Sequence, residues 1–240
     1  MTETIRDPSG RQWKAGCLPR TTKVGDGTFK IFDPAKAKSQ RRTSIITLDT
    51  LKTLVWHIID QGNQGSCCGC AGVMLVMLMR EIMGLKRVIL SQASLYGLGN
   101  GGSDSGMAID TCAKLLIKIG ACPVDIIGQY DWREFRRDYY PDGHPEGQRY
   151  KAIEAYDCPD LETMQAANDL GFPVMYGAKG HAVVRFGLDI NSWGVGWKDG
   201  GLGVWATDAE LRREISRYGA MALRAAIDPV NDFDLPKPAV

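Results

Sequence analysis

Hydrophobic and polar positions divide the chain into three stretches. Residues 1–45 are polar, with turn signals and few periodic apolar positions, so they are expected to form an extended arm with one short strand near residues 28–32. Residues 67–84 are apolar around most of a helical circumference, which predicts a central helix buried on nearly all faces. After residue 150, short apolar runs broken by glycines predict strands.

The same spacing predicts further elements on both sides of residue 150. Residues 107–119 have helical spacing that stops at Gly120, whereas the aromatic and charged stretch 125–147 is expected at the surface. Later in the chain, strands are predicted over 151–156, 173–176, 182–186, 200–206 and 220–227, and helices over 159–170 and 208–217. A helical first half followed by a mostly β second half predicts an α+β fold with two lobes.

This pattern also sets the expected domain organisation. Residues 1–45 are the arm, and residues 46–228 form one domain with lobes of about 46–148 and 149–228. Residues 229–240 are expected to be a C-terminal tail. Because a polar arm has no core of its own, we expect it to pack on the body of the chain or on a neighbouring subunit.

Composition and charge restrict the classes of partner. The chain has 240 residues, of which 44% are hydrophobic and 24% charged, and these are values for a globular protein with a real core. The net charge is +1, so no overall field attracts nucleic acid or an anionic membrane, and neither partner is expected. The amino terminus lacks the apolar core of a secretory signal, and the apolar run 67–79 is too short to span a membrane. A soluble protein without a signal peptide is therefore expected.

Seven cysteines are an odd set in a chain without an export signal. Such a set indicates a reducing compartment, the cytoplasm, and not a disulfide scaffold. The alternative that Cys67, Cys68 and Cys70 begin a metal cluster needs a second Cys or His pair at matched spacing, and the sequence has none. We expect no metal and no cofactor.

The cysteine cluster marks the place where a polar glycine-containing loop becomes the central helix. The first N–H groups of a helix lack internal partners and carry partial positive charge, which favours thiolate over thiol. Gln61 lies six residues before Cys67, and its side-chain amide can donate to an oxyanion beside that sulfur. Neighbouring helical side chains differ by about 100° in direction, so only one of the thiols can face a given base.

Three histidines are candidates for that base. His57 lies in an apolar run, which favours a structural role, and His144 is expected in an exposed turn. His181 begins a β run, which is a rigid mount, and it precedes Asn191 by ten residues. An Asn carbonyl can hold the imidazole in the tautomer that faces a sulfur, so His181 is the favoured base.

Three blocks of the sequence resemble the signatures of the papain-like cysteine peptidases, in that family's order. They are Gln61 with Gly65-Ser66-Cys67, Gly180-His181-Ala182-Val183, and Asn191-Ser192-Trp193-Gly194. The resemblance implies a two-lobed papain-like fold with a helical N-terminal lobe, a β-rich C-terminal lobe and a cleft between them. It also implies roles for individual residues: Cys67 as nucleophile, His181 as base, Asn191 as its orienting partner, Gln61 as oxyanion donor, and Trp193 as cover over the Asn–His contact.

Several positions depart from the family pattern. Cys68 replaces the Trp that follows the nucleophile, and the Gln61 spacing together with the Gly-Ser lead-in favours Cys67 as the attacking thiol. The resemblance further implies that Gly101, Gly102, Gly180 and Trp193 bind substrate, although the inserted SDSG leaves Gly106 as an alternative to Gly102. Short connections before and after the His block predict trimmed cleft walls.

These residues predict a cysteine peptidase that hydrolyses peptide or isopeptide bonds through a thioester. A first alternative is a peptidase fold kept as a structural or assembly component, for example of a virion, with a protein partner bound through the arm. The ordered polar arm and the lack of the family's inhibitory helix motivate this alternative and argue against ordinary zymogen control. A second alternative, a cell-wall peptide amidase or acyl transferase, uses the same triad.

Overall fold

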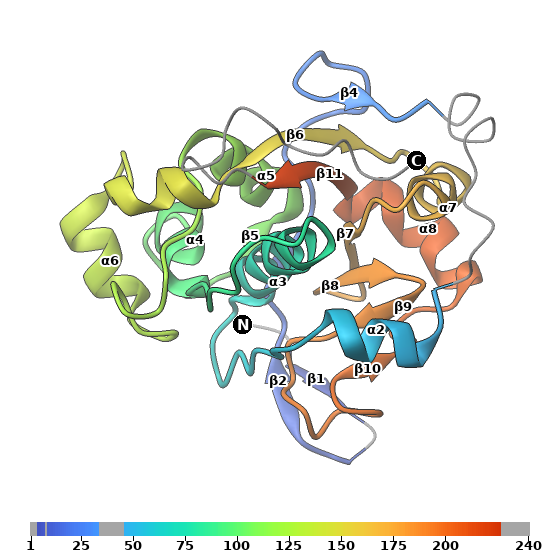
Figure 1. Cartoon of the computed structure of the whole chain (residues 1–240), viewed down its shortest axis with the longest axis horizontal. Helices are drawn as coiled ribbons and strands as arrows, with labels where there is room; N and C mark the ends of the chain where they lie inside the picture. Colours follow the sequence, from blue (N-terminus) through green and yellow to red (C-terminus); the bar gives the residue numbers. More distant parts are fainter. Residues whose placement is uncertain (1–3, 8, 34–45, 227–240) are drawn as a thin grey trace.

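The computed structural model describes residues 4–7, 9–33 and 46–226 (Figure 1). The expected C-terminal tail, residues 229–240, lies outside the described residues. Helices are the main secondary structure before residue 150, and an antiparallel sheet dominates after it, so the expected α+β fold is confirmed. Among the described residues, no helix combines the length and the apolar character needed to cross a membrane.

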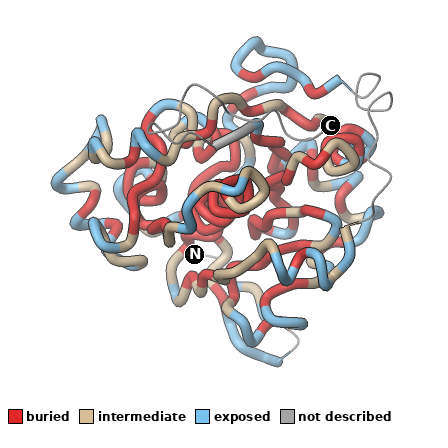
Figure 2. The backbone as a smooth tube through the Cα atoms, viewed as in Figure 1, coloured by how far each residue is buried: buried red, intermediate tan, exposed pale blue. Residues whose placement is uncertain are grey.

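The helical region surrounds one buried helix. Its elements are α2 (Leu48–Leu54), α3 (Cys67–Ile82), α4 (Gln92–Gly99), α5 (Ile109–Lys118), α6 (Trp132–Tyr139) and the 3₁₀ helix η1 (Pro145–Tyr150). Every residue of α3 from Cys67 to Arg80 is buried, and buried chain gathers around it in Figure 2. The predicted central helix is therefore confirmed, and burial of its whole circumference stabilises it more than helix propensity does.

One seven-stranded sheet forms the second region. Its order is β10 (Leu202–Gly203), β9 (Leu188–Ile190), β8 (His181–Phe186), β7 (Val174–Ala178), β11 (Ala220–Ala226), β6 (Ala152–Asp157) and β4 (Lys30–Ile31). Alternate residues of β8 face opposite sides, so Ala182 and Val184 join the core around α3 while Val183 joins the other core. Helices α7 (Leu161–Asp169) and α8 (Asp208–Tyr218) pack against that other face. The sheet thus lies between α3 and the pair α7 and α8.

The stretch 125–147 differs from the expectation of a surface region. It contains α6, whose Trp132 and Phe135 are buried at helical spacing, and α6 packs on α4. Helix α4 ends in a glycine-rich stretch and contains Gly97 and Gly99. A Cβ atom on Gly97 would lie 2.6 Å from the carbonyl oxygen of Trp132, so that glycine permits close packing of the two helices.

The arm packs on the body of its own chain at several places. Strands β1 (Thr4–Arg6) and β2 (Gln12–Lys14) form a hairpin, and β3 (Cys17–Leu18) pairs in parallel with β5 (Met107–Ala108). Strand β4 then adds to the edge of the main sheet by parallel pairing with β6. The described part of the arm therefore crosses from one region of the fold to the other.

Candidate active site

The candidate nucleophile, Cys67, is the first residue of α3. The N-cap residue Ser66 makes no capping hydrogen bond with its side chain, so the hydroxyl does not occupy the N–H groups of the first turn. Free N–H groups and the helix dipole place partial positive charge at this end. The local structure therefore favours a thiolate at residue 67.

The pKa values distinguish the three clustered thiols. Burial alone raises the pKa of the Cys67 thiol, but interactions with Cys68 and His181 and with the backbone N–H of Ala182 hold it well below its ordinary value. Burial and the neighbouring thiols Cys17 and Cys67 raise the pKa of Cys68 well above its ordinary value. Burial also raises the pKa of the third thiol, Cys70. Of these three thiols, Cys67 is the one whose pKa is lowered, which favours its thiolate form.

His181 begins β8 and makes one defined hydrogen bond through its ring. Its Nε2 lies 2.8 Å from Oδ1 of Asn191, and because an amide oxygen only accepts, Nε2 must carry the proton. The other ring nitrogen, Nδ1, is buried without a hydrogen-bond partner among the described residues. Asn191 thereby leaves Nδ1 as the nitrogen that can exchange a proton with Cys67.

Aromatic rings enclose the imidazole on two sides. The ring centroid of Trp193 lies 4.6 Å from that of His181, and the ring of Trp205 meets His181 edge-on at 5.3 Å. These rings exclude water from the contact between His181 and Asn191, which strengthens the hydrogen bond by lowering the local dielectric. The position of Trp193 agrees with the cover expected for that residue.

Hydrogen bonds hold the side-chain amide of Gln61 in one orientation. Ser192 Oγ donates to Oε1 of Gln61 at 2.8 Å, and this bond leaves Nε2 to act as the donor. Nε2 donates to the carbonyl oxygens of Gln64 at 2.9 Å and of Lys14 at 3.2 Å. The amide can thus stabilise negative charge on an oxygen at the position where the Lys14 carbonyl lies.

The two other histidines have structural surroundings. His57 packs beside Trp56, and burial lowers its pKa. His144 accepts from the backbone N–H of Glu146 at Nδ1, 3.1 Å away, and so caps η1. The structure brings His181, and neither of these, together with Cys67, Asn191 and Gln61. Within the described part of the chain, no three His, Cys, Asp or Glu side chains are grouped so as to hold a metal ion.

Residues 13–17 of the arm cover the site. Trp13 stacks on Trp193 with ring centroids 5.4 Å apart and planes at 7°. The N–H groups of Gly16 and Cys17 donate to the carbonyl oxygen of Gly180 at 3.1 and 2.9 Å. With the arm in this position, four side chains of the site have no exposed surface, namely Cys67, His181, Asn191 and Gln61.

Gly16 fits between the glycines of the opposite wall. A Cβ atom on Gly16 would collide with the carbonyl oxygen of Gly65, and one on Gly106 would collide with that of Gly16. The N–H of Met107 donates to this Gly16 oxygen at 2.9 Å. The structure thus brings Gly106 to the arm, whereas Gly102 lies beside Arg136 of α6. Substrate contact by Gly101 and Gly102 stays a prediction.

Sequence reasoning missed several residues of this site. Trp13 is an apolar residue isolated in a polar arm, and that isolation was the available signal. Asp104, which pairs with Lys14 of the arm at 2.6 Å, and Trp205 had no signal, because their contacts come from segments far apart in the chain. The arm has no helix among its described residues, and yet it covers the site.

The fold of the chain resembles solved structures of papain-like cysteine proteases. Xylellain, a cysteine protease from Xylella fastidiosa, matches with a TM-score of 0.63 and 17% identity over 88% of this chain and 97% of that chain. The digestive procathepsin L 3 of Tenebrio molitor larval midgut matches with a TM-score of 0.59 and 15% identity, over 85% of this chain and 75% of that one. The recombinant stem bromelain precursor matches with a TM-score of 0.58 and 13% identity, over 85% and 77%.

No protein-family model and no curated protein matches the sequence. At these identities the likeness to solved structures establishes the fold and not the activity. The papain-like fold expected from the three sequence blocks is therefore confirmed.

Proposed function

We propose that the chain is a papain-like cysteine peptidase held latent by residues 13–17 of its own arm. The observation that carries this proposal is the position of His181, bonded to Asn191 at 2.8 Å and interacting with the thiol of lowered pKa, Cys67. The likeness of the fold to cysteine proteases supports it, and two of the matched structures are precursor forms by their titles.

The geometry supports hydrolysis of a peptide or isopeptide bond in two steps. The Cys67 thiolate attacks the carbonyl carbon, and the oxyanion accepts hydrogen bonds from Gln61 Nε2 and the backbone N–H of Cys67. His181 gives its proton to the leaving amine, and a thioester remains on Cys67. His181 then removes a proton from water, which attacks the thioester, releases the acid and restores the thiolate.

Every described cysteine is a free thiol, and the sequence has no others. We place the active protein in a reducing compartment, because oxidation would consume the Cys67 thiolate.

The test uses the full chain carrying Trp13→Ala, which removes the stack on Trp193. We expect this chain to cleave unfolded protein substrates, and Cys67→Ala to abolish cleavage. The matched change Cys158→Ala removes a buried thiol of raised pKa from the other core, away from Cys67, and should leave cleavage in place. Peptidase activity that persists in Cys67→Ala, or is absent while Cys67 is freely alkylated, would refute the proposal.

The lowered pKa predicts a distinctive pH profile for alkylation in the same opened chain. The rate follows the thiolate fraction, so the rate at which iodoacetamide modifies Cys67 should fall less between about pH 8 and about pH 6 than the rate for free cysteine. Free cysteine, with a pKa of about 8.5, loses about tenfold per pH unit over that range. Mass spectrometry of the modified peptide measures the rate, and His181→Ala should return the profile toward that of free cysteine.

One observation favours a second function, a binding or assembly component without activity. The covered site has no exposed surface, and the arm is anchored behind it by the buried ion pair of Arg20 and Asp157. A component of this kind would form an assembly larger than one chain and would keep Cys67 unreactive in the Trp13→Ala chain. Size measurement by light scattering together with the alkylation assay distinguishes the two functions.

A further inference from the structure

Lys14 contacts the site through both its backbone and its side chain. Its carbonyl oxygen accepts from Gln61 Nε2 at 3.2 Å, and its ammonium group lies 2.6 Å from Oδ2 of Asp104. One residue therefore satisfies the oxyanion donor and an acidic side chain at the same time. Gln61 Nε2 and Asp104 Oδ2 thus bind the carbonyl oxygen and the cationic side chain of one and the same residue.

Asp104 is fixed in place by the body of the protein. Its Oδ1 accepts from the backbone N–H of Gly65 at 2.8 Å and from the hydroxyl of Tyr96 at 2.6 Å. Oδ2 is thereby left for a cation. Burial raises the pKa of Asp104, but the bonds from Lys14, Tyr96 and Gly65 outweigh burial and hold it below its ordinary value. The carboxylate is therefore charged at neutral pH.

The carboxylate lies beside the loop that leads into the nucleophile. Gly65 precedes Cys67 by two residues, and a Cβ atom on Gly65 would lie 3.4 Å from Oδ1 of Asp104. The Asp104 side chain is only 20% exposed with the arm in place, and Lys14 is its ion-pair partner among the described residues. When the arm leaves, a largely buried charge loses its partner, which is costly unless another cation replaces it.

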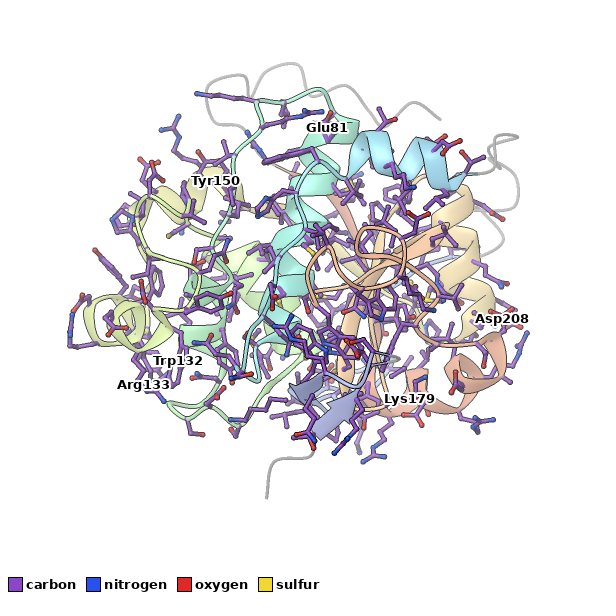
Figure 3. The ribbon with its side chains drawn as sticks, turned by 90° about the horizontal axis from the view of Figure 1, so that it is seen from below. Glu81, Trp132, Arg133, Tyr150, Lys179 and Asp208 are labelled. Atoms are coloured by element: carbon purple, nitrogen blue, oxygen red, sulfur yellow. The ribbon has the colours of Figure 1, made fainter. Side chains whose placement is uncertain are left out.

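We propose that Asp104 selects substrates with Lys or Arg at the residue whose carbonyl is attacked, and that Lys14 takes the place of this residue in the closed chain. Such selection presumes that Cys67 is the nucleophile, as proposed above. Figure 3 shows the arm between the side of the molecule that carries Trp132 and Arg133 and the side that carries Lys179 and Asp208. A peptide in the opened cleft would lie between the same two sides.

The experiment measures the selection directly in the full chain. Trp13→Ala and Lys14→Ala together open the cleft and vacate Asp104. Three peptidyl acyloxymethyl ketone probes differ only in the residue next to the electrophile, which is Lys, norleucine or Glu. Norleucine keeps the aliphatic stem of Lys and lacks its charge. We expect the Lys probe to label Cys67 about 10 to 100 times faster than the norleucine probe, the range for a hydrogen bond to a charged group.

Two variants of Asp104 in the opened chain test whether this residue causes the difference. Asp104→Asn keeps an acceptor for Gly65 and Tyr96 and removes the charge, so the ratio of Lys to norleucine labelling should fall to near one. Asp104→Lys should reverse the order and favour the Glu probe over the Lys probe. Thermal unfolding of each variant checks that the loop is retained. Equal labelling by the Lys and norleucine probes in the opened chain, or a ratio that Asp104→Asn leaves unchanged, overturns the inference.

A binding measurement keeps the inference separate from the proposed activity. Cys67→Ala in the opened chain removes the nucleophile, and calorimetry compares peptide amides that contain Lys or norleucine at the selected residue. Tighter binding of the Lys peptide that Asp104→Asn abolishes supports selection by Asp104 even if no substrate is cleaved, in which case the peptidase proposal alone fails. Cleavage or labelling without preference for Lys leaves the peptidase proposal standing and overturns the selection. Binding of neither peptide overturns the selection as well.

Discussion

The two halves of the arm contact the body in different ways. The front half, residues 13–17, lies over the site and joins no strand of the main sheet. It is held by backbone hydrogen bonds, by the ion pair of Lys14 with Asp104 and by the stack of Trp13 on Trp193. The rear half, residues 20–32, carries the buried Arg20–Asp157 pair, places Phe32 in a core and adds β4 to the main sheet. The rear half is thus part of the folded body, and we expect the front half to act as a cover that opens while the rear half stays in place.

The largest effect on stability is expected at the rear half. Arg20→Ala leaves the Asp157 carboxylate, 2% exposed, without its cation. Removing one partner of a buried pair costs about 3 to 5 kcal/mol, so the free energy of unfolding in urea should fall by this amount. The matched change Lys30→Ala breaks the Lys30–Glu154 pair, whose lysine is 76% exposed, and should cost less than about 1 kcal/mol. Similar losses in both variants would contradict the buried role of Arg20.

A substitution in the front half is expected to change how readily a reagent reaches Cys67. Trp13 is 1% exposed, and Trp13→Ala removes its burial and its stack on Trp193. A loss of about 3 kcal/mol from the closed state should speed alkylation of Cys67 about 100-fold through local opening. Arg20→Ala should change this rate little, because the anchor is not part of the cover. Equal acceleration by both variants would show that the arm opens as one unit.

The smallest effect is expected at the ion pair of the cover. Lys14→Met keeps the aliphatic stem and removes the ion pair with Asp104. The Lys14 side chain is 23% exposed and the Asp104 side chain is 20% exposed. A partly exposed pair contributes about 1 kcal/mol, so alkylation of Cys67 should be about five times faster. Gln12→Met, on the same hairpin, serves as the control and should leave the rate unchanged. A rate equal to that of the unchanged chain would show that Lys14 does not help to close the cover.

The fold was predictable where the pattern of the sequence is local. The circumference of α3 is apolar, and β8 is a short apolar run between Gly180 and Gly187, so both elements were predicted from the local pattern alone. Helix α6 was not predicted because most of its residues are charged and only two aromatic residues, Trp132 and Phe135, are buried. Close packing of α4 on α6 uses glycines that, in sequence, indicate a loop.

The candidate site was predictable for residues within short blocks. Gln61, Cys67, His181 and Asn191 lie in such blocks, and the structure brings them together. The cover was not predictable, because the contact of Lys14 with Asp104 joins residues 90 positions apart and depends on tertiary packing. The polarity of the arm indicates that it must pack on another part of the fold to be ordered, and it does not show where.

The close approach of Gly16 to Gly65 and Gly106 constrains how the sequence can evolve. A side chain at position 16 or 106 has no room while the arm lies in the cleft, since each glycine faces a backbone carbonyl group. We therefore expect related chains that keep the covering arm to keep glycine at both positions. In a related chain without the arm, this contact no longer requires a glycine at position 106.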